Sequence, residues 1–281
     1  MYKLNKYIKK YPYLKEIISK KGEHTEVSEE IVNIYKTKYD FLKKYTFNKY
    51  RKKRNQMTSS GSWLSKNKDD SIDIVGDVLT TVSVFKFIDE NYDLESIRLF
   101  EIFKYIYHTV GNYLPMGEGG NLGGYPGTDN FSRKLYLIKQ VFDNEIEKDL
   151  SKQDYDSSKD NEIRKKIEDG KSLGSSKSNL HYWIKTEWID KNKNWDDFID
   201  ENYLNEMVDE NKRPIYWGKN EYNWNLKNLK PNELNRIIAY CIKMIIYRGY
   251  RVCYKSKSKK IDNVEELKDI MNYLNLNKYF L

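Results

Sequence analysis

The chain has 281 residues, a formal net charge of +8, and 39% hydrophobic and 15% aromatic residues. This composition excludes a disordered chain, and the length allows one large or two modest domains with a sizeable core. The longest apolar tract, IIAYCIKMIIY, is too short to span a bilayer, and the N-terminus lacks the apolar segment of a signal peptide. The two cysteines, Cys241 and Cys253, are too few for a disulfide framework. We therefore expect a cytoplasmic protein with no membrane contact.

Positive charge is concentrated in the first quarter of the chain. Residues 1–68 carry 18 Lys or Arg and 6 Asp or Glu, whereas the remainder carries 32 basic and 36 acidic residues. A local basic surface attracts polyanions more strongly than a diffuse one. This asymmetry predicts nucleic acid or an acidic protein surface as the partner, and it leaves the oligomeric state open.

Helical spacing of apolar residues predicts the elements of the first half. A helix is expected over 28–50, with Ser28 as its N-cap. An apolar stripe then predicts a helix over 75–88. Asp93 is expected to cap a third helix that ends at Gly111, where a glycine-rich stretch begins.

The second half is also expected to be helical. A helical pattern resumes after Asp129, and the segment 182–224, which holds five of the six Trp, predicts short helices. Further helices are expected at 232–248 and 263–276. No alternating pattern is long enough to support a sheet. The expected class is mainly α, an irregular helical domain with a long Gly-rich loop and little or no sheet.

Four segments describe the expected organisation. They are a basic helical N-terminal region (1–68), a helical core with the Gly-rich loop (69–147), a flexible polar insertion or linker (148–180), and a Trp-rich helical C-terminal region (181–281). Within the polar insertion, a short charged helix is one alternative. Residues 68–281 are expected to form one domain.

The glycine-rich stretch is the first candidate site, because seven of the 14 glycines fall within 111–127. Glycine permits positive φ and close backbone approach, so amide groups can converge on an anion. No Gly-Lys-Ser/Thr follows, as a Walker loop needs, and no strand precedes it, as a dinucleotide fold needs. The stretch is either a packed surface loop or a binding loop. The candidate anion-binding residues are Gly111, Asn112, Gly119, Gly120, Asn121 and Arg133.

Catalysis would centre on the same stretch. If the protein is an enzyme, the candidate catalytic residues are His108, Asp77 and Asp129, with His108 as general acid or base. The alternative places His108 at a helix end, near the C-terminal dipole. No Cys/His cluster suggests a metal, no cofactor is expected, and no Gly-x-Ser-x-Gly elbow is present. The sequence supports no familiar enzyme class.

A second candidate site is the run KKYTFNKYRKKRN, residues 43–55, which interleaves aromatic and basic residues. Phosphate contacts combined with stacking rings are typical of proteins that bind single-stranded nucleic acid or RNA. An acidic protein surface would use the same charges, and a solvated surface is the simpler alternative. The candidate binding residues are Lys49, Tyr50, Arg51, Lys52, Lys53 and Arg54.

Four segments together resemble an uncharacterised bacterial family of unknown function. They are GDVLTT (76–81), YHTVGNYLPMGEGGN (107–121), WDDFIDENYLNEMV (195–208) and IIYRGYRV (245–252). The first departs from the family pattern, a Gly-Asp-Thr-Met-Asn-Ser-like element, by reading Val78, Leu79, Thr80 and Thr81. The resemblance implies that one constellation contains Asp77, His108, Gly111, Asn112, Pro115 and Asn121.

Two function classes follow from these patterns. The first is an interaction protein of bacterial or phage origin that engages nucleic acid or a partner protein, with phage–host conflict as the setting suggested by size, AT-rich composition and resemblance. The second is an enzyme acting on a phosphate-containing substrate, a nuclease or nucleotide hydrolase with its site in the 108–131 loop.

Overall fold

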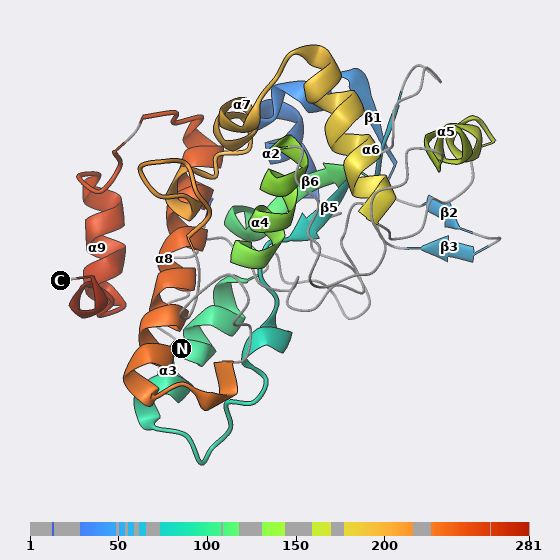
Figure 1. The fold of residues 1–281 in the computed structure, drawn as a ribbon. Coiled ribbons are helices and arrows are strands. Elements are labelled where there is room, and N and C mark those ends of the chain that lie inside the picture. The colour runs from blue at the N-terminus through green and yellow to red at the C-terminus, as the bar shows by residue number, and fades with distance from the viewer. Residues whose placement is uncertain are drawn as a thin grey trace.

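Figure 1 shows the computed structural model, which describes residues 13, 29–48, 51–53, 56–58, 62–65, 74–107, 109–117, 131–143, 159–169, 177–215, 226–258 and 260–280. The fold is mainly helical, as predicted. The described residues form eight α-helices: α2 (Glu29–Lys38), α3 (Leu94–Ile106), α4 (Phe131–Phe142), α5 (Asp160–Glu168), α6 (Lys177–Glu187), α7 (Trp195–Glu201), α8 (Pro231–Tyr254) and α9 (Glu265–Tyr273).

A small antiparallel sheet lies within this helical fold. Its strands follow the order β1-β4-β5-β6, and a separate two-stranded ribbon pairs β2 with β3. The bounds are β1 (Tyr45–Asn48), β2 (Arg51–Lys53), β3 (Gln56–Thr58), β4 (Ser62–Ser65), β5 (Ile74–Val78) and β6 (Tyr113–Gly117). Strand β6 contains Pro115, which lacks a backbone N–H and is tolerated because β6 is an edge strand of this sheet.

Two helices predicted from the sequence do not form as expected, because parts of both ranges belong to the sheet. The helix predicted over 28–50 ends at Lys38, and the chain continues through the 3₁₀ helix η3 (Asp40–Lys44) into β1. The helix predicted over 75–88 is replaced by strand β5 and the 3₁₀ helix η4 (Val82–Phe85). Apolar β-branched residues fit both helical spacing and a buried strand, and here pairing with β6 determines the outcome.

Local signals at helix ends were more reliable. Asp93 caps α3 as predicted, because its side chain accepts hydrogen bonds from the backbone N–H groups of Glu95 and Ser96. Helix α3 ends at Ile106, however, and Gly111 lies in the separate 3₁₀ helix η5 (Val110–Asn112). The prediction that Gly111 terminates the helix is therefore wrong.

The C-terminal half contains the predicted helices and one addition. Helix α8 includes the expected 232–248 segment, and Pro231 occupies its first turn, where a missing N–H costs nothing. Helix α9 covers the central part of 263–276. Within the predicted polar insertion 148–180, α5 is the short charged helix given as an alternative, and α6 already begins at Lys177.

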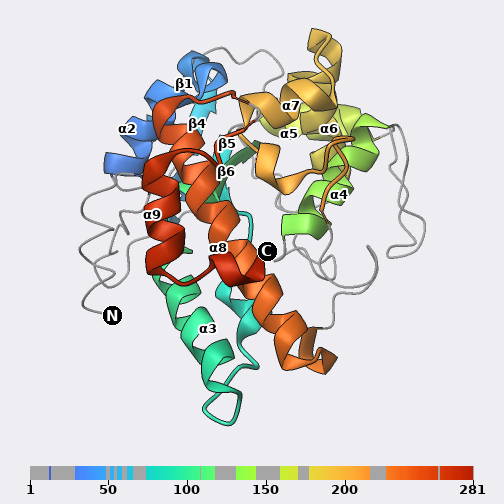
Figure 2. The ribbon, with the colours of Figure 1, turned by 90° about the vertical axis from the view of Figure 1, so that its left-hand side faces the viewer.

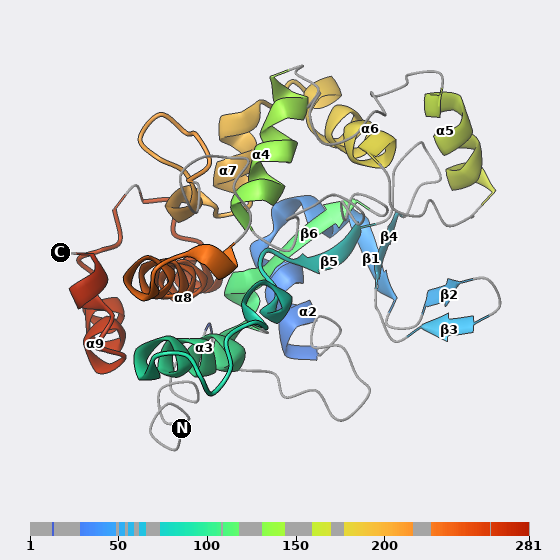
Figure 3. The ribbon, with the colours of Figure 1, turned by 60° about the horizontal axis from the view of Figure 1, so that its bottom comes forward.

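Helices lie on both sides of the sheet. Helices α4, α6 and α7 lie on one side of β5 and β6, and α3 and α8 lie on the other (Figure 3). Helix α8 contacts α3, α9, α2 and η5, so it is the central helix of its group (Figure 2). Among the described helices, none combines the length and apolar character needed to cross a bilayer.

Candidate functional site

Many predicted site residues lie outside the described part of the chain. They are His108, Asp129, Gly119, Gly120, Asn121, Lys49, Tyr50 and Arg54. Asp77 is described at the backbone level, in β5 opposite Leu114 of β6. Within the described ranges, no group of three or more His, Cys, Asp or Glu residues could hold a metal ion. The catalytic hypothesis therefore stays a prediction.

Asn112 and Gly111 have structural roles. The Asn112 side chain is fully buried: its Oδ1 accepts from the Thr80 N–H at 3.1 Å, and its Nδ2 donates to the carbonyls of Thr80 and Tyr107 at 2.7 Å. A Cβ on Gly111 would lie 1.9 Å from the carbonyl oxygen of Ile245, so only glycine allows η5 to approach α8. Both residues are buried and have these packing roles, and their assignment to anion binding stays a prediction.

Arg248 of α8 connects segments that are distant in sequence. Its fully buried guanidinium donates from Nη1 to the carbonyls of Gly111 and Tyr113 at 2.8 and 2.7 Å, and from Nε to the Asn202 carbonyl at 3.1 Å. Its Nη2 donates to the Tyr39 hydroxyl at 2.6 Å. We name this cluster the polar joint; its members are Tyr39, Val110, Gly111, Tyr113, Asn202 and Arg248.

The polar joint provides a structural reason for the motif residues. Asn112 ties the segment 107–121 to 76–81, and Arg248 ties it to the end of α7. Burial raises the pKa of Tyr39 to about 12, although the positive charge of Arg248 acts in the opposite direction, so this hydroxyl stays neutral at physiological pH. All four segments of the resemblance contribute to this region, but the family assignment itself stays a prediction.

Arg133, the remaining predicted anion ligand in the described residues, lies in α4. Its side chain is fully buried, and its guanidinium carbon lies 5.6 Å from the centre of the Tyr136 ring. A cation at this distance from an aromatic face is stabilised by the ring quadrupole. Arg133 is buried in α4, and its role as an anion ligand stays a prediction.

The described part of the predicted basic site forms a β-ribbon. Arg51 pairs with Thr58, Lys52 with Met57, and Lys53 with Gln56. Figure 3 shows this β2–β3 hairpin at the margin of the molecule, beyond β1 and β4 and away from α8. Residues 51–53 of the basic run therefore form a strand, and the helix that the sequence predicted over residues up to 50 ends at Lys38.

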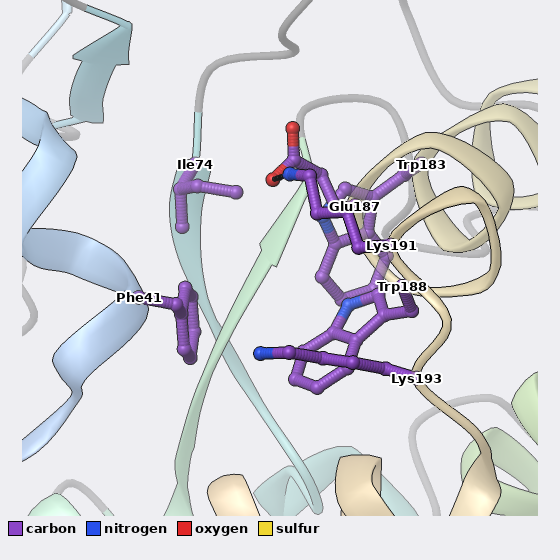
Figure 4. Close-up of a pocket in the computed structure, with 7 residues that line it drawn as sticks. All are labelled: Phe41, Ile74, Trp183, Glu187, Trp188, Lys191 and Lys193. Atoms are coloured by element: carbon purple, nitrogen blue, oxygen red, sulfur yellow. Dashed lines mark hydrogen bonds and ion pairs between the residues drawn. The ribbon is translucent and has the colours of Figure 1, made fainter.

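An aromatic cavity of about 240 Å³ lies between η3, the start of β5, and α6 (Figure 4). Its apolar walls are Phe41, Ile74, Trp183 and Trp188, and the rings of Phe41 and Trp188 meet edge to face with centres 5.8 Å apart. A Cβ on Gly117 would lie 2.3 Å from the Trp183 ring, so glycine at the end of β6 makes room for this wall. We call this space the aromatic cavity.

Charged residues line the aromatic cavity beside the two tryptophans (Figure 4). Glu187 accepts from Lys191 at 2.6 Å, and its side chain is only 9% exposed. The Nζ of Lys193 lies 5.2 Å from the Trp188 ring centre and 2.6 Å from a carboxylate oxygen of Glu201. The cavity therefore combines flat apolar surfaces with groups that can accept and donate hydrogen bonds.

A second hollow of about 320 Å³ adjoins the first, since both include Phe41 and Lys193. We call it the polar hollow; it is lined also by Lys38, Asp40, Glu201, Tyr203 and Lys257. Hydrogen bonds from Lys43 and Lys255 lower the pKa of Asp40, so this carboxylate is already paired. Small-molecule sites typically occupy about 300 Å³ or more, which makes the two spaces together large enough for one ligand.

These hollows were missed by the sequence prediction. Their residues come from four separate segments, around 38–41, at 74, around 183–203 and at 257, and residue spacing along one segment carries no signal of such a meeting. The segment 182–224 is rich in Trp, but buried Trp is more often core than site.

No family model matches the chain, and no curated protein or solved structure matches it at a significant level.

Proposed function

We propose that the protein binds nucleic acid, preferentially single strands, through the β2–β3 hairpin. The observation that supports this most directly is that three residues of the basic run form a β-ribbon at the margin of the molecule. A two-stranded ribbon is narrow enough to enter a nucleic-acid groove or to lie along a strand.

Charge and composition support the same partner. The segment 1–68 carries all the excess positive charge of the chain, and the hairpin lies within it. Strand β1 leads into the hairpin and contains Tyr45 and Phe47 close to Lys49 in the sequence. Basic residues neutralise phosphates with release of counterions, and neighbouring aromatic residues stack unpaired bases.

The test is a salt series on a variant that carries serine at all four basic positions, 51 to 54. Binding of a labelled single-stranded oligonucleotide and its duplex is measured by fluorescence anisotropy between about 50 and about 200 mM salt. The variant should bind more weakly, and the slope of log K against log salt should decrease by up to about 3, since each lost phosphate contact on a single strand contributes about 0.7.

A matched control removes four positive charges elsewhere. Lys86, Lys159, Arg236 and Lys268 are exposed and lie on other elements, so their joint replacement by serine should leave the slope close to that of the wild type. Equal losses in both variants would show non-specific charge attraction and contradict the proposal. Binding to poly-glutamate with none to nucleic acid would also contradict it, in favour of an acidic protein partner.

A further inference from the structure

Trp188, a wall of the aromatic cavity, carries a buried donor that has no acceptor among the described residues. Trp188 is 2% exposed, and its indole Nε1 makes no hydrogen bond within the described residues. An unmet buried N–H costs about 1–3 kcal/mol, so proteins rarely retain one without a reason. By contrast, the indole of Trp195, in the next helix, donates to the Lys212 carbonyl at 2.7 Å. Because the Trp188 side chain lines the cavity, a ligand bound there would change the surroundings of this indole.

The walls of the cavity select a flat ligand. Phe41 and Trp188 meet edge to face, and Trp183 forms the neighbouring wall (Figure 4). Aromatic rings at this spacing favour stacked or edge-on contacts with another ring. Glu187 adds an acceptor that is 9% exposed, which suits a ring bearing an amino group. A nucleobase supplies flat faces, acceptor atoms and donors together.

The polar hollow has a surplus of positive charge. Within the described residues, Lys38 and Lys257 have no ion-pair partner, although both line the hollow. Its two carboxylates are already paired, Asp40 with lysines outside the lining and Glu201 with Lys193. The two lysines without an ion-pair partner lie beside carboxylates whose charge other lysines already neutralise. This arrangement favours an anion at this position, and phosphate is an anion that lysine binds well.

We propose that the aromatic cavity and the polar hollow form a binding site for a nucleoside phosphate. The base lies in the cavity between Phe41 and Trp183, and the phosphate lies in the hollow at Lys38 and Lys257. Lys193, which lines both spaces, faces the junction of the two groups. This site goes beyond the hairpin proposal, because it needs none of residues 51–54 and accepts either a free nucleotide or an unpaired nucleotide of a strand.

Isothermal titration calorimetry of the full chain with AMP, CMP, GMP and UMP tests this site. At least one nucleotide should bind more tightly than its nucleoside and than inorganic phosphate, because only the nucleotide fills both spaces. On binding, the indole Nε1–H signal of Trp188 should shift in the NMR spectrum. A homo-oligonucleotide of the preferred base that binds at least tenfold more tightly than the mononucleotide would identify a strand as the source. Absence of any nucleotide binding at millimolar concentration overturns the proposal.

Two variants separate the two halves of the site. Phe41→Ala should weaken nucleotide and nucleoside alike by about 5- to 150-fold, the range expected for loss of one stacked ring. The double variant Lys38→Ala/Lys257→Ala should weaken the nucleotide and leave the nucleoside unchanged. Phe87→Ala, which also removes a half-buried ring, is the control for the first variant. Equal effects of the two Phe variants overturn the assignment.

The hairpin variant distinguishes this proposal from the preceding one. The Arg51→Ser/Lys52→Ser/Lys53→Ser/Arg54→Ser variant should keep its affinity for the mononucleotide, even where its affinity for a strand decreases. Loss of mononucleotide binding in that variant, with an unchanged melting temperature, would place the nucleotide at the hairpin and contradict the cavity assignment.

Discussion

Replacing Arg248 with Met removes the central donor of the polar joint with little change in side-chain length. In the native protein this guanidinium is fully buried and donates to four backbone carbonyls and the Tyr39 hydroxyl, with no carboxylate among these acceptors. Four of the acceptors are backbone carbonyls, which no compensating substitution can remove. The variant would therefore bury carbonyls that have lost their donor.

The size of the effect follows from these contacts. Leaving a buried acceptor without its donor costs about 1–3 kcal/mol, and removing a buried charge returns some desolvation energy, so a net cost of about 3–5 kcal/mol is less than the sum over the separate hydrogen bonds. We expect Arg248→Met to lower the free energy of unfolding by that amount. For a chain of this size, each kcal/mol shifts the melting temperature by about 2 °C, so a decrease of about 6–10 °C is expected.

Urea denaturation followed by tryptophan fluorescence measures this free energy, and circular dichroism gives the melting temperature. The matched control is Arg236→Met, on the exposed face of the same helix, for which a change within about 0.5 kcal/mol is expected. Arg248→Lys should give an intermediate value, because one ammonium group cannot reach all the acceptors to which the planar guanidinium donates along its different edges. If Arg248→Met costs no more than Arg236→Met, the polar joint does not stabilise the fold.

Two further substitutions test other contacts. Hydrogen bonds, first from Arg98, lower the pKa of Glu95 from 4.5 to about 2, so its carboxylate stabilises the fold above about pH 4.5 and less as the pH falls toward 2. Glu95→Gln should cost about 1–2 kcal/mol in urea denaturation at pH 7 and less than half of that at pH 3; an equal cost at both would refute the linkage. Gly111→Ala should cost about 3 kcal/mol or more, because the new Cβ would meet backbone of Ile245 at 1.9 Å. Gly249→Ala, with its nearest contact at 2.9 Å and a gain in helix propensity, should cost less, and thermal melts showing the opposite order would contradict this reasoning.

Sequence patterns predicted the structural features that depend only on residues close together in the chain. Asp93 caps α3 because a cap needs only its own first turn, and α8 follows from a long apolar stripe after Pro231. The sequence did not distinguish strand β5 from a helix, because its conformation depends on pairing with β6. The paired residues are far apart in the chain: Asp77 pairs with Leu114, some 37 residues later. The strands are also too short to show a clear alternating pattern in the sequence, since no strand in the described residues exceeds five residues.

The same distinction applies to the candidate sites. Gly111 was noticed as part of a glycine-rich stretch, yet the reason for glycine is the carbonyl oxygen of Ile245 in α8. No local pattern predicts that approach. The aromatic cavity requires Phe41 and Trp183 to line one space, which depends on how η3 and α6 are placed by their own packing. The charge of residues 51–54 can be read from the sequence, whereas the pairing of 51–53 with 56–58 cannot.

Synthesis of the chain imposes an order on the polar joint. The carbonyls of η5 and β6 leave the ribosome 135 to 138 residues before Arg248, which donates to them. Contacts of this sequence separation form slowly, because a long loop must close before any hydrogen bond compensates for the lost entropy. Until α8 emerges, these carbonyls lack the buried donor that they have in the folded protein. The interval between these two segments is therefore the period in which the growing chain is most open to proteolysis and to pairing with other nascent chains.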